Sequence, residues 1–146
     1  MNAFLAVSQL PVALAEAINN AGVGPFVVLA GILILYLILG CVMDTMSMIL
    51  LTIPIFFPLI MGLDFYGLDQ TEKAIWFGIL ALMVVEIGMI TPPVGMNVYV
   101  ISSMARDVPL RDAFRGVVPF LISDILRVVV LVLFPSITLC LVRWLT

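Results

Sequence analysis

The chain has 146 residues, of which 64% are hydrophobic and 10% charged, and its formal net charge at pH 7 is -3. Six basic and nine acidic side chains are too few to cover a soluble domain of this size, so the composition predicts an integral membrane protein. The charges form no basic run, which excludes the usual nucleic-acid-binding classes. Histidine is absent, which excludes histidine-ligated metals and Ser-His-Asp triads. We therefore expect neither an enzyme nor a cofactor.

Residues 1–24 are expected to form an arm at the membrane interface. They superficially resemble a signal peptide, but a basic region is missing and Gln9 and Pro11 interrupt the apolar stretch. Polar and apolar residues alternate at helical spacing over residues 12–18, with Glu16 facing outward, which predicts a short interfacial helix.

Residues 25–63 predict a helical hairpin. Its two arms, residues 26–39 and 46–61, would extend only about 21 Å and 24 Å as helices, less than the roughly 30 Å of a hydrocarbon core. The linking sequence GCVMDT predicts a tight turn. This turn could be a surface loop or the tip of a re-entrant hairpin that stops within the membrane. The short arms favour the re-entrant form, which needs surrounding protein or a watery cavity.

Residues 74–105 are too long for one crossing, whereas the hairpin arms are too short. A continuous helix over them would be about 48 Å long, well beyond one bilayer core. The sequence TPPVG inside this segment supplies a break. Pro92 and Pro93 lack N–H donors, and a proline also pushes the residue before it out of the helical region. We therefore predict two helical halves, over residues 74–89 and 96–105.

An interfacial loop over residues 106–116 and a last transmembrane helix over residues 117–146 complete the predicted segments. Within the loop, RDVPLRDAFRG predicts an amphipathic interfacial helix with its arginines near the headgroups and Leu110 and Phe114 facing inward. The loop 106–116 carries three arginines, whereas the loop 64–73 on the opposite side carries one lysine. The positive-inside rule then places residues 106–116 in the cytoplasm and the C-terminus in the periplasm.

The predicted helix break is the first candidate site. A break in lipid frees backbone groups that protein, water or an ion must satisfy. Unwound carbonyls suit a dehydrated cation, and the N-terminus of the following half-helix suits an anion, as in transporters with discontinuous helices. A kink that only shapes helix packing is the alternative. The candidate cation ligands are Gly88, Thr91 and Val94, and the substrate or break residues are Pro92, Pro93, Gly95 and Asn97.

Four ionisable side chains lie in apolar segments, where a charge is costly and marks a candidate functional site. Asp44, at the hairpin tip, could bind a cation or cap the following helix. Glu86, one turn before the break, could bind an ion or join two helices by a hydrogen bond. Asp124 and Arg127, spaced i,i+3 on the last helix, are expected to form a structural ion pair.

Three blocks of the sequence carry a family resemblance: GCVMDTMSMILLTIPIFFPLI, WFGILALMVVEIGMITPPVGMNVYVI and DVPLRDAFRGVVPFLISDILRVVVLVLFP. They resemble successive blocks in the C-terminal part of the large membrane subunit (DctM-like) of TRAP (tripartite ATP-independent periplasmic) transporters. The resemblance covers nearly the whole chain in the expected order. The double-proline block and the block MILLTIPIFFP are specific in combination.

The resemblance implies a Na⁺-driven importer of organic acids, such as C4-dicarboxylates or sialic-acid-like sugars, that works by an elevator motion in the bacterial inner membrane. It also implies a periplasmic binding protein that delivers the substrate and a small membrane subunit that braces the large one. The family is built from inverted repeats, and residues 26–62 and 74–105 resemble the second hairpin and the second broken helix. The implied Na⁺ site lies where the hairpin tip near Gly40 meets Gly88, Thr91 and Val94.

The family's large subunit is about three times as long as this chain, and the half with the first repeat is missing. Either the chain is a fragment or another polypeptide supplies that half. Alternatives to transport are a structural or assembly subunit, a truncated permease without transport of its own, and a pore-forming oligomer with Asp44 as a selectivity ring. An intramembrane enzyme has no support, since no nucleophile–base pair is visible.

Overall fold

The computed structural model describes residues 20, 22–92, 95–105 and 109–145, and the elements in these ranges are helices. They are α3 (Pro25–Gly40), α4 (Thr45–Gly62), α5 (Gln70–Ile90), α6 (Met96–Met104), α7 (Leu110–Leu133) and α8 (Pro135–Leu145). These ranges contain no strand, which confirms the all-helical prediction for this part of the chain. The expected arm over residues 1–24 lies almost wholly outside the described residues.

Three of the helices, α4, α5 and α7, have the length and apolar composition of membrane spans. α3 is also apolar but has 16 residues, which makes it about 24 Å long. The protein therefore has the build of a multi-pass membrane protein. The re-entrant path of the α3–α4 hairpin stays a prediction.

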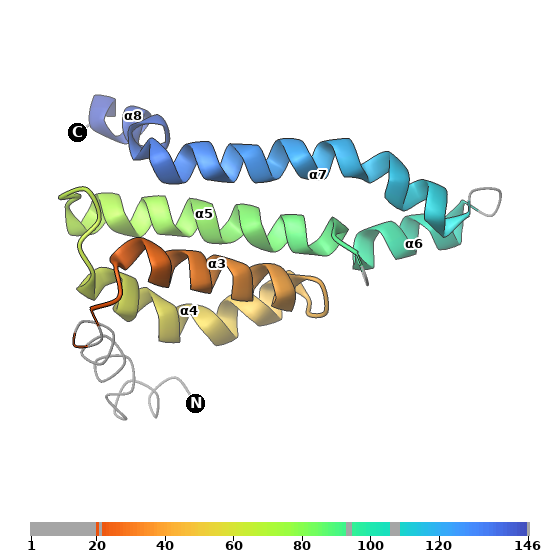
Figure 1. Ribbon diagram of the computed structural model, residues 1–146, viewed down its shortest axis with the longest axis horizontal. Helices are drawn as coiled ribbons and strands as arrows, with labels where there is room; N and C mark the ends of the chain where they lie inside the picture. The colour runs from red at the N-terminus through yellow and green to blue at the C-terminus, as the bar shows by residue number, and fades with distance from the viewer. Residues whose placement is uncertain (1–19, 21, 93–94, 106–108, 146) are drawn as a thin grey trace.

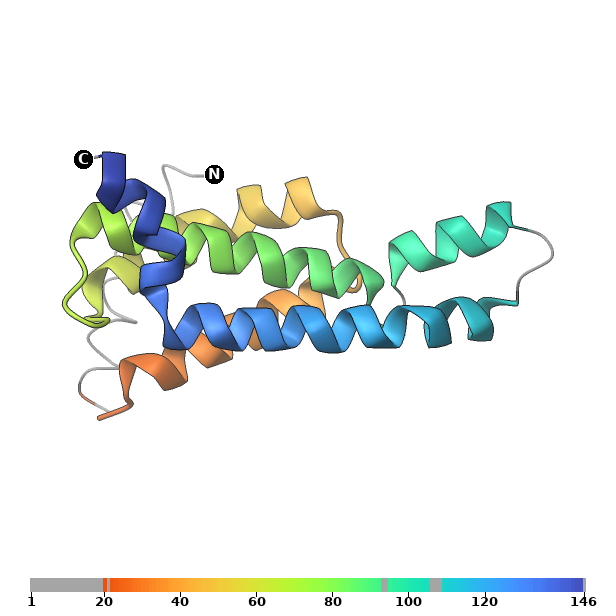
Figure 2. The same cartoon turned by 90° about the horizontal axis from the view of Figure 1, so that it is seen from above.

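α5 lies at the centre of the arrangement (Figure 1). α3 and α4 run antiparallel to each other on one side of α5, and α7 runs antiparallel to α5 on its other side. The turn between α3 and α4 lies beside the end of α5, whereas α6 and the first part of α7 continue beyond it (Figures 1 and 2). The hairpin therefore covers only part of the long axis, and its tip meets the chain where α5 ends.

The core forms around the first half of α5. Trp76, Phe77 and Leu80 are fully buried there, together with Tyr36 of α3 and Phe65 of the α4–α5 loop. The rings of Phe65 and Trp76 have centroids 5.4 Å apart, and those of Tyr36 and Phe77 6.5 Å apart. Aromatic packing thus holds the hairpin and its loop against α5.

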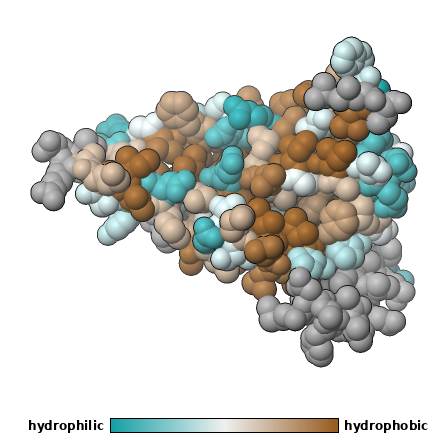
Figure 3. All heavy atoms as spheres, turned by 180° about the vertical axis from the view of Figure 1, so that it is seen from behind, coloured by the Kyte–Doolittle hydropathy of each residue, from teal (hydrophilic) through white to brown (hydrophobic). Residues whose placement is uncertain are grey.

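α7 leaves most of its apolar surface uncovered. Phe120, Ile122 and Leu126 are 68%, 61% and 65% exposed, and Leu131 is the residue of α7 that the described structure buries. Figure 3 shows hydrophobic residues over much of one face of the molecule. Such a surface suits lipid or further transmembrane helices rather than water.

α3 and α5 touch through two glycines. A Cβ atom added to Gly88 would lie 2.8 Å from the Cα of Gly40 and 2.8 Å from the carbonyl oxygen of Leu37. A Cβ atom added to Gly40 would lie 2.9 Å from the carbonyl oxygen of Val85. These are backbone atoms that cannot rotate away, so only glycine lets the helices approach so closely. The contact fixes the hairpin tip beside the end of α5.

The C-terminal segment differs from the prediction in two ways: no boundary separates residues 110–116 from the helix predicted over 117–146, and that helix is not single. α7 begins at Leu110, so the part of the predicted loop from this residue onward forms helical turns. These turns agree with the amphipathic helix predicted for this stretch, and Arg111 and Arg115 lie on its exposed positions. At the other end α7 stops at Leu133, and α8 starts at an angle to it (Figure 2). Pro135 causes this second break.

The carbonyl groups at the end of α7 are bound by neighbouring elements. Pro135 has no N–H to offer the Leu131 carbonyl four residues earlier. The buried indole of Trp76 donates to this carbonyl instead, at 2.9 Å. The Tyr66 hydroxyl donates to the next carbonyl, that of Val132, at 3.2 Å. α5 and the loop before it therefore anchor the end of α7.

Lys73 is a second structural anchor. The positive-inside argument assigned it to the loop 64–73, but it lies in a helix. It lies in the first turn of α5 and is 5% exposed. Its ammonium group donates to the Leu63 carbonyl at 2.6 Å and to the Met61 carbonyl at 3.4 Å. Both carbonyls lie at the C-terminal end of α4, where the helix dipole favours a cation. The orientation of the chain in the membrane stays a prediction.

Replacing Gly88 with alanine is expected to destabilise the fold. The new methyl group would push α3 away from α5, and overpacking of this kind costs about 1–3 kcal/mol. Gly78→Ala is the matched control, because Gly78 lies on the same helix with nothing within 4 Å of its missing Cβ. Thermal unfolding in detergent micelles, followed by circular dichroism, should show a lower midpoint for Gly88→Ala only. Equal midpoints would contradict the close contact.

Trp76→Phe should also lower the unfolding midpoint, because it leaves the Leu131 carbonyl without its donor. A buried carbonyl that loses its partner costs about 1–3 kcal/mol. Trp144→Phe makes the same chemical change at a side chain that is 81% exposed, and it should leave the midpoint unchanged. The indole bond to α7 would be refuted by a Trp76→Phe variant as stable as Trp144→Phe.

Candidate functional site

α5 ends at the double proline. Thr91, which precedes the first proline, has an extended backbone (φ -85°, ψ 133°), as expected before proline. Its N–H donates to the Gly88 carbonyl at 3.1 Å, and its hydroxyl donates to the Ile87 carbonyl at 2.5 Å. Because Pro93 has no N–H, the Met89 carbonyl receives no helical donor from four residues ahead. Thr91 therefore satisfies part of the backbone that the break frees.

α6 begins after a left-handed glycine. Gly95 has φ 48° and ψ 64°, a conformation that glycine adopts without strain. The ring of Phe114 on α7 would lie 2.8 Å from a Cβ atom at this position, so a side chain here would be strained and would also displace this ring. Pro92 is exposed in the turn, whereas Pro93 and Val94 lie outside the described residues.

The hairpin tip lies against this break. Gly40, at the end of α3, contacts Gly88, one turn before the break. Thr45, the first residue of α4, has its hydroxyl oxygen 2.7 Å from the sulfur of Met89. The structure thus brings the tip and the residues next to Thr91 into one region. Their role in binding a cation stays a prediction.

Asp44 caps α4 at the hairpin tip. Its carboxylate accepts a hydrogen bond from the Ser47 N–H at 3.2 Å, and its side chain is exposed. The capping role considered from the sequence is therefore present. The described residues contain no group of three or more Asp, Glu, Cys or His side chains arranged to hold a metal ion.

A polar hollow of about 370 Å³ lies between the hairpin tip, the break and α7, and we call it the tip hollow. It is lined by Thr45, Glu86, Met89, Ile90, Asn97 and Asp124. These residues come from four helices and offer a hydroxyl, an amide and two carboxylates. Asn97, predicted at the break, thus shares a hollow with Glu86 and with the acid of the predicted ion pair.

A second hollow of about 290 Å³, here the arginine hollow, is lined by Met83, Glu86, Ile87, Asp124 and Arg127. Glu86 and Asp124 line both hollows, so the two are neighbours. The guanidinium Nη1 of Arg127 lies 3.2 Å from Oδ1 of Asp124, and the two side chains are 60% and 28% exposed. The ion pair expected from the i,i+3 spacing therefore lies at the wall of a hollow rather than inside the core.

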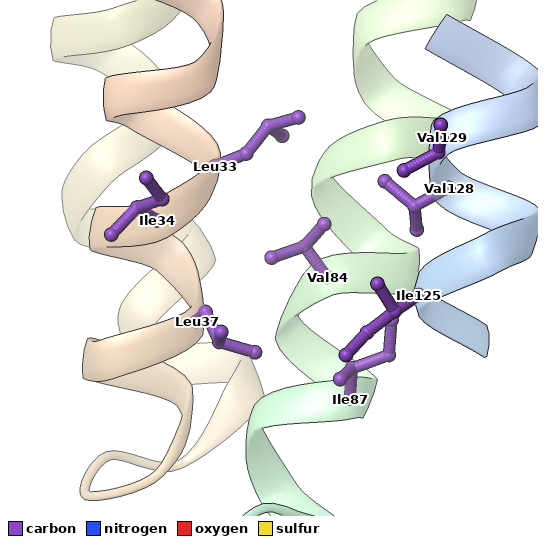
Figure 4. Close-up of a pocket in the computed structure, with 8 residues that line it drawn as sticks. All are labelled: Leu33, Ile34, Leu37, Val84, Ile87, Ile125, Val128 and Val129. Atoms are coloured by element: carbon purple, nitrogen blue, oxygen red, sulfur yellow. The ribbon is translucent and has the colours of Figure 1, made fainter. Parts of the chain in front are cut away.

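An apolar groove runs between α3 and α7 over α5 (Figure 4). Its labelled side chains, among them Leu33, Val84 and Val128, are all aliphatic and come from these three helices. A groove without a polar group cannot bind a charged solute in lipid. Lipid chains or apolar helices suit it, and a charged ligand belongs to the polar hollows.

The chain matches the family model described as "Tripartite ATP-independent periplasmic transporter, DctM component" over residues 1–137. This chain belongs to that family. It is 34% identical over 141 residues to the C4-dicarboxylate TRAP transporter large permease protein DctM of Pseudomonas aeruginosa, which covers 97% of this chain. It is 33% identical over 137 residues to the sialic acid TRAP transporter large permease protein SiaM of Vibrio cholerae, which covers 94% of this chain.

The DctM match confirms the family expected from the three sequence blocks. The chain spans 31% of the length of the Pseudomonas protein and 30% of the Vibrio protein. It also matches the 2,3-diketo-L-gulonate TRAP transporter large permease protein YiaN of Escherichia coli, with 29% identity over 140 residues. These relatives are permeases rather than enzymes. No solved structure gives a significant match to this chain.

The sequence predicted the Asp124–Arg127 pair but did not indicate that Glu86 lies beside it. Glu86 and Asp124 lie far apart in the chain, and only the antiparallel packing of α5 on α7 brings them to the same hollows. Thr45 was read as part of a turn, although it lines the tip hollow. The one available signal was that each of these groups lies in an apolar segment.

Proposed function

We propose that this chain forms the C-terminal part of a Na⁺-coupled TRAP permease that imports organic acids across the bacterial inner membrane. The proposal rests on one observation above all, namely the contact between the hairpin tip at Gly40 and the broken helix at Gly88. A hairpin tip packed on an interrupted helix is the arrangement in which freed backbone oxygens can bind a coupling cation.

The substrate class follows from the relatives and from the hollows. The relatives are named for C4-dicarboxylates, sialic acid, 2,3-diketo-L-gulonate and, in Halomonas elongata, ectoine. These compounds share a carboxylate group, whereas the rest of each molecule differs. A small carboxylate is therefore the substrate class we assign, and the polar hollows beside the break are the place for it.

The cation site would be built from Gly40, Gly88 and Thr91, with Val94 and Asp44 as further candidates. The carbonyl of Gly88 accepts one hydrogen bond from Thr91, and its second lone pair stays available. The hydroxyl of Thr91 donates to Ile87, so its oxygen can still face a cation. Sodium with oxygen ligands fits this set better than a transition metal.

Transport would need partners. A periplasmic binding protein would deliver the acid, and a small membrane subunit would brace the permease. Because the chain spans about 30% of its relatives, the remaining part of the large subunit would complete the site. In the membrane, residues 106–116 would face the cytoplasm and the C-terminus the periplasm, with the hairpin moving as part of an elevator.

Uptake assays test this function directly. Cells that express the chain with the remaining part of the large subunit and the other TRAP subunits should accumulate at least one of succinate, N-acetylneuraminate and ectoine when Na⁺ is present. Replacing Na⁺ with K⁺ should abolish the uptake. Flux that continues without a Na⁺ gradient would favour a pore, and no uptake with any partner would contradict the transport role.

Thr91→Val should weaken Na⁺ coupling. Loss of an oxygen that contacts a charge costs about 1.5–3 kcal/mol, so the Na⁺ concentration for half-maximal uptake should rise by about tenfold or more. Thr91→Ser keeps the hydroxyl and should behave like the wild type. Thr138→Val is the matched control, because Thr138 makes a similar hydroxyl bond, to the Pro135 carbonyl at 2.7 Å, away from the break. An unchanged Na⁺ dependence in Thr91→Val would exclude this ligand.

A further inference from the structure

The Asp124–Arg127 pair has features that a purely structural ion pair does not need. The Arg127 side chain is 60% exposed, and its single described ion-pair contact is 3.2 Å long. Charge-assisted contacts of this kind are usually about 2.7–2.9 Å, and arginine can hold a carboxylate with two parallel N–H groups. Most of the five N–H donors of Arg127 are therefore free to bind a second acceptor.

The chain contains a second ion pair that shows the contrast. Arg143 on α8 donates from Nε to the Glu72 carboxylate of α5 at 2.6 Å. This pair ties two helices together at the end of the molecule that carries the chain's C-terminus (Figure 1). The Asp124–Arg127 pair joins two residues of one helix, so it ties no elements together. Its position on the wall of the arginine hollow is its distinguishing feature.

Arg127 is also the one cation that lines either polar hollow among the described residues. It lies in α7, a helix apolar enough to span a membrane, where a guanidinium is costly and demands an anionic partner. We propose that Arg127 binds a carboxylate of the transported acid, and that Asp124 is the internal anion that this carboxylate replaces. This assignment rests on the proposed function, and it names the residue that recognises the substrate class.

The neighbouring carboxylates compete with the substrate carboxylate at this site. Asp124 holds Arg127 when no substrate is bound, and Glu86 across the hollow repels an entering anion. A cation bound nearby would offset this repulsion, which connects carboxylate binding to the cation that drives transport. Removing the charge of Asp124 should therefore strengthen carboxylate binding, whereas removing Arg127 should abolish it.

Binding of a carboxylate to Arg127 can be tested directly by its protection of the guanidinium against chemical modification. Membrane vesicles that contain the chain with the remaining part of the large subunit and the other TRAP subunits are treated with phenylglyoxal, and the modification of Arg127 and Arg143 is followed by mass spectrometry. Succinate and N-acetylneuraminate are the probes, with succinamide and N-acetylmannosamine as uncharged counterparts. At least one carboxylate should slow the modification of Arg127 by about fivefold or more, equal to about 1 kcal/mol of binding. Arg143 should react at the same rate throughout.

The Asp124→Asn variant sharpens the test. It should lower the carboxylate concentration that gives half-maximal protection of Arg127, whereas Glu72→Asn, which breaks the other pair, should leave it unchanged. Failure of both carboxylates to protect Arg127, or equal protection by the uncharged counterparts, would overturn the assignment. Protection that is weaker in Asp124→Asn would overturn the proposed competition.

Uptake separates this inference from the proposed function. Arg127→Gln should abolish Na⁺-dependent uptake of the acid that the wild type accumulates, and Arg143→Gln should retain it. If the wild type accumulates no acid, the transport role itself fails. If the wild type transports and the two arginine variants behave alike, the transport role stands and the carboxylate assignment fails.

Discussion

The lack of water around a lipid-embedded backbone is the constraint on which the structure depends. Each proline inside an apolar segment removes an N–H, and the carbonyl four residues earlier must then find another donor. At Pro135 the donor is the indole of Trp76, which anchors the end of α7 to α5. At the double proline, Thr91 donates its N–H to the Gly88 carbonyl and its hydroxyl to the Ile87 carbonyl. Protein thus closes the break at Pro135, whereas at the double proline Thr91 satisfies only part of the freed backbone.

The same constraint explains where the polar groups gather. The hairpin tip can approach the open break because Gly40 and Gly88 have no side chains to separate α3 from α5. The tip hollow and the arginine hollow lie beside this contact and share Glu86 and Asp124. In the proposed function, the backbone oxygens assigned to a cation and the guanidinium assigned to a carboxylate would therefore be neighbours, as ion-coupled uptake of an acid requires.

Sequence reasoning predicted the local features well, because they depend on covalent chemistry. Proline has no N–H, so the break near Thr91 follows from residue type alone. The meeting of the hairpin tip with Gly88 was expected from the family resemblance, and the missing Cβ atoms of Gly40 and Gly88 permit it. The continuity of α7 was not predicted, because a hydropathy profile separates the amphipathic stretch before residue 117 from the apolar stretch after it. The burial of Lys73 and the grouping of Glu86 with Asp124 depend on which helices pack together, and this packing cannot be predicted from the sequence of one segment.

Cysteine crosslinking tests most directly whether the hairpin tip closes on the break around a cation. Cys41 and Cys140, both free thiols, would be replaced by serine, and Thr45→Cys would be paired with Met89→Cys or, as a control, with Met104→Cys at the far end of α6. A short bifunctional thiol reagent should link the first pair only, with a higher yield in Na⁺ than in K⁺, because a cation bound by both elements holds them together. Equal yields in the two salts, or no link between the tip and the break, would contradict the account.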